Sequence, residues 1–219
     1  MKWFHAHKYL VLLAIVIIAL MLEPRVRGIG MGVAYVIVLA VFMTVFQHRR
    51  NRITGLMLGL PTLAAEAACH VVSGTDRLLP LVAYHALIAV FLAFAVVTVL
   101  RDIFENQRIG FDHLLGAFCG FVLLGIAWGN LYLLNELVAP GSFRIRPEIA
   151  AELQHEETRR FLFNYLSFMT LTAGGFEDLV PVATTARNLT WLEAMFGQFY
   201  VAVYIGQLMA LKATPSVSA

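Results

Sequence analysis

One short stretch of the chain concentrates residues whose types and spacing could do chemistry. Residues 172–178 read Thr-Ala-Gly-Gly-Phe-Glu-Asp, which places a hydroxyl, two glycines and two carboxylates close together. Hard cations prefer oxygen ligands, including carboxylates and backbone carbonyls. Glycine allows backbone angles that other residues adopt only at a cost in free energy. The chemistry predicted for this stretch is therefore the coordination of a cation, with no covalent step.

The surrounding segment, residues 161–181, is too short and too polar to cross a bilayer. Residues 161–171 are aromatic and aliphatic without Gly or Pro, which predicts a helix of about three turns. The glycines and Pro181 then end helical structure. Non-helical backbone at membrane depth requires protein or a water-filled path around it, because unpaired peptide groups are costly in lipid. We therefore expect a re-entrant pore helix followed by a loop.

The run from Ser167 to Asp178 resembles the pore helix and selectivity filter of the potassium-channel superfamily. In such filters, backbone carbonyl oxygens replace the hydration shell of the ion. The resemblance implies that Gly175 stands at the first filter glycine, Phe176 at the aromatic position and Asp178 at the acid. It also implies that the Thr172 hydroxyl lies near the inner entrance of the filter.

Three positions depart from the pattern of that superfamily. Ala173 stands where threonine is expected, Gly174 where an aliphatic residue is expected, and Glu177 where the second glycine is expected. A filter glycine adopts backbone angles that would strain a glutamate by roughly 1–3 kcal/mol. We therefore expect weakened or altered potassium selectivity.

The expected permeant ion is a monovalent cation, K⁺ or Na⁺, and no cofactor is expected. Carboxylates of Glu177 and Asp178, repeated around a pore, could also hold a divalent cation such as calcium or magnesium. In the alternative interpretation, Glu177 turns outward and pairs with Arg159 or Arg187. The two interpretations differ in whether the pore mouth carries the charge of Glu177.

The resemblance continues over residues 111–211, which look like an outer helix, a turret, the pore loop and an inner helix. Glu193 is expected to lie behind the filter and to brace it, through Trp191 or Tyr165. Gly197 and Gly206 on the inner helix permit either a bend that gates the pore or close packing of helices.

Composition indicates an all-α membrane protein. Hydrophobic residues make up 60% of the 219 residues and charged residues 14%. The net charge of +2 is too small to indicate a nucleic-acid partner. Six transmembrane helices, four peripheral and two in the pore, are predicted at residues 3–22, 29–47, 53–72, 78–100, 111–138 and 188–211. Residues 1–110 would form a four-helix membrane domain, residues 111–211 the pore domain, and residues 212–219 a short cytoplasmic tail.

The distribution of Lys and Arg predicts the orientation. With six spans, most of these residues lie at the chain ends and in the second and fourth connections. We expect a multi-pass protein of the plasma membrane. The positive-inside rule then places both of its termini in the cytoplasm. One pore loop cannot close a pore alone, so we expect a homotetramer surrounded by membrane lipids.

The first four predicted helices occupy the place of a voltage sensor but lack its arginines. Residues 78–100 contain no Lys or Arg, so strong voltage gating is not expected. Glu66 and His70 share a helix face and could sense pH or satisfy one another. His85 is interpreted as a hydrogen-bonded core residue.

Two functions follow from these patterns. The first is a homotetrameric cation channel that conducts passively through a filter of backbone carbonyls. The alternative is a non-conducting channel homologue with a structural or regulatory role. A hydrolase using Glu66, His70 and His85 would need a metal or nucleophile constellation that the sequence lacks, so enzymatic activity is not expected.

Overall fold

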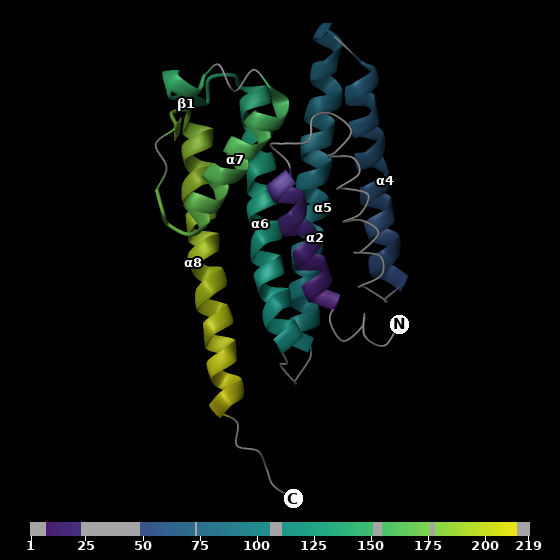
Figure 1. Cartoon of the computed structure of the whole chain (residues 1–219), viewed down its shortest axis with the longest axis vertical. Helices are drawn as coiled ribbons and strands as arrows, with labels where there is room; N and C mark the ends of the chain where they lie inside the picture. The colour runs from purple at the N-terminus through teal and green to yellow at the C-terminus, as the bar shows by residue number, and fades with distance from the viewer. Residues whose placement is uncertain are drawn as a thin grey trace, which may run out of the picture.

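The chain folds as a set of long helices, seen here in a computed structural model (Figure 1). The structure describes residues 8–22, 49–72, 74–105, 111–150, 155–175 and 178–213. Its elements are α2 (Lys8–Leu22), α4 (Arg49–Val71), η1 (Gly74–Arg77), α5 (Leu78–Glu105), α6 (Phe111–Val138), β1 (Phe143–Ile145), η2 (Pro147–Ile149), α7 (Glu156–Leu171), β2 (Leu179–Pro181) and α8 (Thr184–Ala213). Most helices follow the long axis of the molecule, and α7 lies obliquely near α6 and α8.

The predicted helices agree with the structure in position, with shifts at their ends. The span expected at residues 111–138 coincides with α6, and α5 continues past the expected end to Glu105. Helix α4 begins at Arg49, so the cluster of arginines before Ile53 belongs to its first turn. The pore helix is longer than expected, because α7 already begins at Glu156. The span expected at residues 29–47 and the start of the span at 3–22 lie outside the described residues.

Two helices are long and apolar enough to cross a membrane within the part of the chain that the structure describes. They cover Leu78–Phe104 in α5 and Asp112–Val138 in α6. A bilayer core requires about 20 predominantly apolar residues in a helix. The helical fold class is therefore confirmed and membrane association is indicated, whereas the count of six spans and the re-entrant loop stay predictions.

A separate small core holds α7 in place. Tyr132 of α6, Phe143 of β1, Phe163 of α7, Leu179 of β2 and Ala186 of α8 are all buried in one cluster. The rings of Phe143 and Phe163 meet edge to face with centroids 5.1 Å apart, a favourable arrangement for aromatic pairs. The larger core lies between α2, α4, α5 and α6. The part of α7 around Phe163 is therefore held by packing against the elements that precede and follow this helix.

Candidate functional site

Helix α7 and the loop after it begin and end at the same end of the molecule (Figure 1). Strands β1 and β2, which flank this segment, pair antiparallel with Phe143 opposite Pro181. The backbone N–H of Arg146 donates to the carbonyl of Asp178 over 2.9 Å, and the Arg146 guanidinium lies 2.9 Å from the Asp178 carboxylate. The two ends of the segment between Arg146 and Asp178 therefore lie side by side.

Two glycines let α7 lie close to the helices on either side of it. A Cβ added to Gly197 of α8 would meet the backbone of Leu171 at the end of α7, with the Leu171 Cα 3.0 Å away. A Cβ added to Gly129 of α6 would lie 3.0 Å from the Cα of Asn164. Gly197 lies about 20 Å along α8 from Thr184, at a rise of about 1.5 Å per residue. Helix α7 therefore stops near the middle of α8.

The carboxyl group of Glu193 joins the three helices of this region. Glu193 lies on α8 with no exposed surface. The Tyr132 hydroxyl of α6 donates to Oε2 of Glu193, and the Ser167 hydroxyl of α7 contacts Oε1. The same Ser167 hydroxyl lies 2.7 Å from the carbonyl oxygen of Gly125 on α6. Removing this carboxyl group would therefore leave the Tyr132 hydroxyl without its acceptor, whereas Ser167 would keep only its contact with Gly125.

Counting protons defines how these contacts can all be satisfied. A serine hydroxyl has one proton to donate, and the Ser167 hydroxyl contacts two acceptors, Gly125 and Glu193. Both contacts become hydrogen bonds if Glu193 carries a proton and donates it to Ser167, which then donates to Gly125. Tyr132 donates to the other carboxyl oxygen. A neutral Glu193 therefore fits the arrangement, and it avoids an unpaired charge in the core.

Glu193, Tyr165 and Trp191 are the residues that are expected to brace the filter. The carboxyl group of Glu193 is hydrogen-bonded to Tyr132 and Ser167, and the expected bracing of the filter through Tyr165 or Trp191 stays a prediction. Tyr165 is exposed and stacks on Phe161, whereas the exposed Trp191 donates its indole N–H to the Asn188 side chain over 3.2 Å. Both aromatic side chains lie on the surface of the single chain. The hydrogen bonds of Glu193 therefore join α8 to α6 and α7 through two residues that the sequence did not single out, Tyr132 and Ser167.

Helix α7 ends in a hydrogen-bonded turn that includes the first predicted filter residues. The N–H of Gly174 donates to the carbonyl of Met169 over 2.7 Å, and the N–H of Ala173 donates to the carbonyl of Thr170 over 3.1 Å. These are the two bonds of a Schellman motif, which places the residue after the cap in left-handed backbone angles. Ala173 has a φ of +56°, as this motif requires. A position that favours glycine is thus occupied by alanine.

Replacing Ala173 with glycine is expected to stabilise the protein by up to about 1 kcal/mol. Glycine adopts the left-handed angles without the steric cost that a Cβ imposes. The midpoint of thermal unfolding of the purified protein would measure this effect. An Ala150→Gly variant is a suitable control, because Ala150 is exposed and has right-handed angles with a φ of −59°. If Ala173→Gly destabilised the protein as Ala150→Gly does, the left-handed turn at Ala173 would be wrong.

The residues after α7 are exposed in the single chain. Thr172, Ala173, Gly174 and Gly175 all lie at the surface, and Gly175 has a φ of +72°. The Thr172 hydroxyl turns back and donates to the carbonyl of Phe168 over 2.7 Å.

Two predicted filter residues, Phe176 and Glu177, lie outside the described residues. The predicted pairing of Glu177 with Arg159 or Arg187 is therefore neither supported nor opposed. Asp178 forms an ion pair with Arg146, next to the paired strands β1 and β2. This ion pair occupies one of the two carboxylates that were expected at the pore mouth.

Comparison with known proteins finds no relative of this chain. No family model matches this chain, and neither does any curated protein or solved structure. The arrangement around α7 is therefore interpreted from the chain's own residues and contacts.

A polar pocket lies between α7 and the elements α4, η1 and α5. It encloses about 220 Å³ and is lined by polar and charged residues from α4, η1, α5 and α7, among them Glu66, His70, Arg77, Glu156, Glu157 and Arg160. The Arg77 guanidinium lies 2.7 Å from the Glu156 carboxylate at the start of α7. Glu66 and His70 both line this pocket. Glu66 is buried and His70 is exposed, so the two side chains differ in their access to solvent.

His85 is the hydrogen-bonded core residue that was predicted. It is buried, and its Nδ1 lies 2.8 Å from Oδ1 of Asn130 on α6. The Asn130 amide N–H donates to the carbonyl of Ile126 over 2.8 Å, which leaves Oδ1 as the acceptor for His85. This hydrogen bond joins α5 to α6, and a structural role accounts for both polar side chains.

Proposed function

We propose that this chain is one subunit of a membrane channel that conducts cations passively, with a pore region built like that of the potassium-channel superfamily. One observation carries the proposal. Helix α7 enters between α6 and α8, ends near the middle of α8, and is followed by an exposed glycine-containing loop that returns to the same end. In a membrane, such a loop would place backbone carbonyls at mid-depth, where only a water-filled path or protein can satisfy them.

The end of α7 favours a cation. The partial negative charge at the carboxyl end of a helix stabilises a nearby cation by roughly 0.3–1 kcal/mol. The first residues past this end, Thr172 to Gly175, are exposed in the single chain. Four chains arranged around one axis would bring four such ends together and enclose a path between them. Permeation would then require no bond to form or break.

Exposed apolar side chains on α8 support assembly in a membrane. Residues exposed on this helix include Trp191, Met195, Phe196, Phe199, Val201, Val203 and Ile205. Contiguous apolar surface of this kind marks contacts with other chains or with lipid. The inner helices of four subunits would cover part of it, and lipid would cover the rest.

The non-conducting alternative is favoured by one specific observation. The Schellman turn at the end of α7 uses carbonyls of Met169 and Thr170 internally and holds Ala173 in left-handed angles. A loop whose first residues are fixed in this turn would have less freedom to turn its carbonyls towards a passing ion. The two functions share the fold and differ only in ion flux.

Ion flux distinguishes the two functions. The purified protein would be reconstituted in vesicles, and reversal potentials would be measured under gradients of K⁺, Na⁺ and Cl⁻. We expect cation current with weak discrimination between K⁺ and Na⁺, and with inhibition by Ca²⁺ that Glu177→Gln reduces. Glu148→Gln is the matched control, because Glu148 is an exposed acid of η2 that is not among the predicted filter residues.

Two outcomes would contradict parts of this proposal. If the vesicles show no cation flux above protein-free controls, conduction is wrong and the non-conducting alternative stands. A sharp preference for K⁺ that is unchanged in Glu177→Gln would refute the idea that carboxylates at the mouth weaken selectivity.

A further inference from the structure

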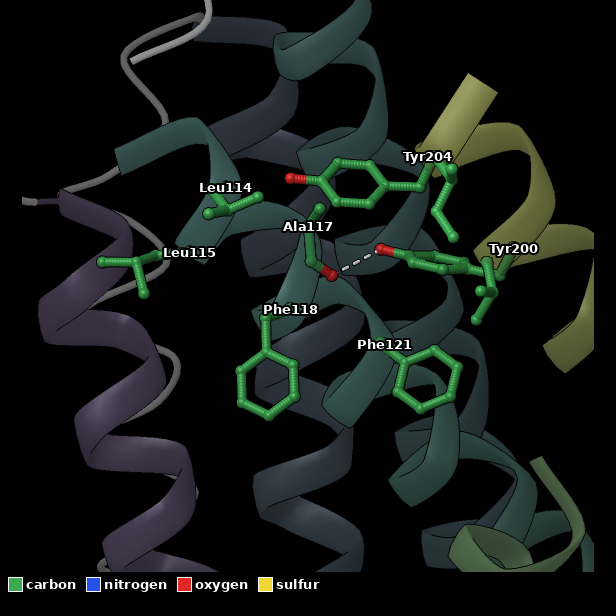
Figure 2. Close-up of a pocket in the computed structure, with 9 residues that line it drawn as sticks. Leu114, Leu115, Ala117, Phe118, Phe121, Tyr200 and Tyr204 are labelled. Atoms are coloured by element: carbon green, nitrogen blue, oxygen red, sulfur yellow. Dashed lines mark hydrogen bonds between the residues drawn. The ribbon is translucent and has the colours of Figure 1, made fainter. Parts of the chain in front are cut away.

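An apolar groove runs between α6 and α8 in the half of the molecule far from β1 and β2 (Figure 2). It has a volume of about 470 Å³, and its lining includes Leu114, Phe118, Phe121, Tyr200, Val201 and Tyr204. This volume lies within the range of about 300–1,000 Å³ that is typical of small-molecule sites. The groove is open along one side, so a ligand could enter it laterally.

The two tyrosines that line the groove differ in their hydrogen bonds. The Tyr200 hydroxyl donates to the carbonyl of Ala117 over 2.6 Å (Figure 2). The Tyr204 hydroxyl is buried and has no hydrogen-bond partner in the described structure. Its ring extends from α8 towards the first turns of α6. A buried hydroxyl without a partner costs free energy, so an acceptor in the groove would be stabilised if the Tyr204 side chain, which lines the groove, turns its hydroxyl towards it.

The position of the groove along α6 indicates its depth in a membrane. Leu114 lies close to the start of the apolar stretch Asp112–Val138, and Phe121 lies about 10 Å further along the helix at a rise of about 1.5 Å per residue. The groove therefore covers the outer part of one leaflet, which is about 15 Å thick. Acyl chains occupy this depth, and their ester groups lie at its outer edge.

We propose that this groove binds one acyl chain of a glycerophospholipid from the leaflet at the start of α6, and that the ester carbonyl of this chain accepts a hydrogen bond from Tyr204. The proposal depends on the membrane embedding of the proposed function and not on conduction. A helix of a second copy fits the groove less well. Its backbone carbonyls would already be paired within the helix, so Tyr204 would remain without an acceptor.

The test measures lipid retention by native mass spectrometry. The full chain would be purified from bilayers of phosphatidylglycerol with either ester-linked or ether-linked chains. Tyr204→Phe is expected to weaken retention of the ester lipid about fivefold. The ether lipid lacks the carbonyl, so it should bind the unchanged protein as weakly as the ester lipid binds Tyr204→Phe. Tyr204→Phe should have no further effect on the ether lipid.

A second pair of variants locates the binding site. Val201→Trp should abolish retention because Val201 lines this groove, whereas Val203→Trp should leave it unchanged. Val203 is also exposed on α8 but lines a neighbouring groove of about 350 Å³ between α5, α6 and α8. If Val203→Trp abolished lipid retention and Val201→Trp left it unchanged, the assignment to the α6–α8 groove would be wrong.

Three other results would overturn the proposal. These are equal retention of ester and ether lipids, unchanged retention in Tyr204→Phe, and a smaller oligomer in Val201→Trp, which would assign the groove to a second copy. Ion flux measured on the same samples separates the two proposals. If lipid retention behaves as expected while the unchanged protein shows no flux, the lipid site stands and only conduction is wrong.

Discussion

Replacing Glu193 with alanine is expected to lower the free energy of unfolding by about 3–5 kcal/mol. The substitution leaves the buried Tyr132 hydroxyl without its acceptor and the Ser167 hydroxyl without its donor, and it creates a cavity where α6, α7 and α8 meet. Thermal unfolding of the purified protein in detergent, followed by circular dichroism, would measure the loss. We also expect the cation flux in vesicles to fall, because the end of α7 would no longer be held.

Glu193→Gln is the matched control and is expected to cost less than about 1 kcal/mol. The glutamine carbonyl can accept from Tyr132, and its amide can donate to Ser167, as a protonated carboxyl would. Equal destabilisation by Glu193→Gln and Glu193→Ala would contradict the neutral carboxyl inferred from the contacts of Ser167.

The second large effect is expected at Gly197. A Cβ at this position would meet the backbone of Leu171, so Gly197→Ala must displace the end of α7 from α8. Overpacking of this kind costs roughly 1–3 kcal/mol. Because the predicted filter residues follow Leu171 directly, we expect the reconstituted protein to lose most of its cation flux.

Gly206→Ala provides the control on the same helix. A Cβ at Gly206 would have no atom within 4 Å, so this variant should be stabilised by up to about 1 kcal/mol through helix propensity. Flux should be unchanged. This result would indicate that Gly197 is needed for close packing of α8 against α7 and not for a bend in α8. If both alanine variants change flux alike while stability is retained, a bend at these glycines is the better explanation.

Hydrophobic patterning predicted the long helices well, because each of them consists of a long run of mainly apolar residues. The bounds of α6 agree with the prediction residue for residue. The start of α7 was missed because residues 156–160 are polar and give no apolar signal. Acidic residues at a helix N-terminus interact favourably with its dipole, and Glu156 also pairs with Arg77.

The predicted site was incomplete because a sequence does not show which residues on different helices meet. The resemblance to potassium channels predicted that Glu193 braces the filter. Its partners Tyr132 and Ser167 lie on two other helices, and their contact depends on how α7 lies between α6 and α8. The close approach at Gly197 depends on the same packing. A polar residue in the middle of an aromatic run, as Ser167 is, was the one available signal.

The most direct test of the central claim is an experimental structure of the full chain in lipid nanodiscs, with K⁺ present. The proposed function predicts four copies around one axis, with residues 172–178 of each copy facing that axis and ion density lying on it. Single chains, or assemblies in which these residues face lipid or bulk solvent, would contradict it.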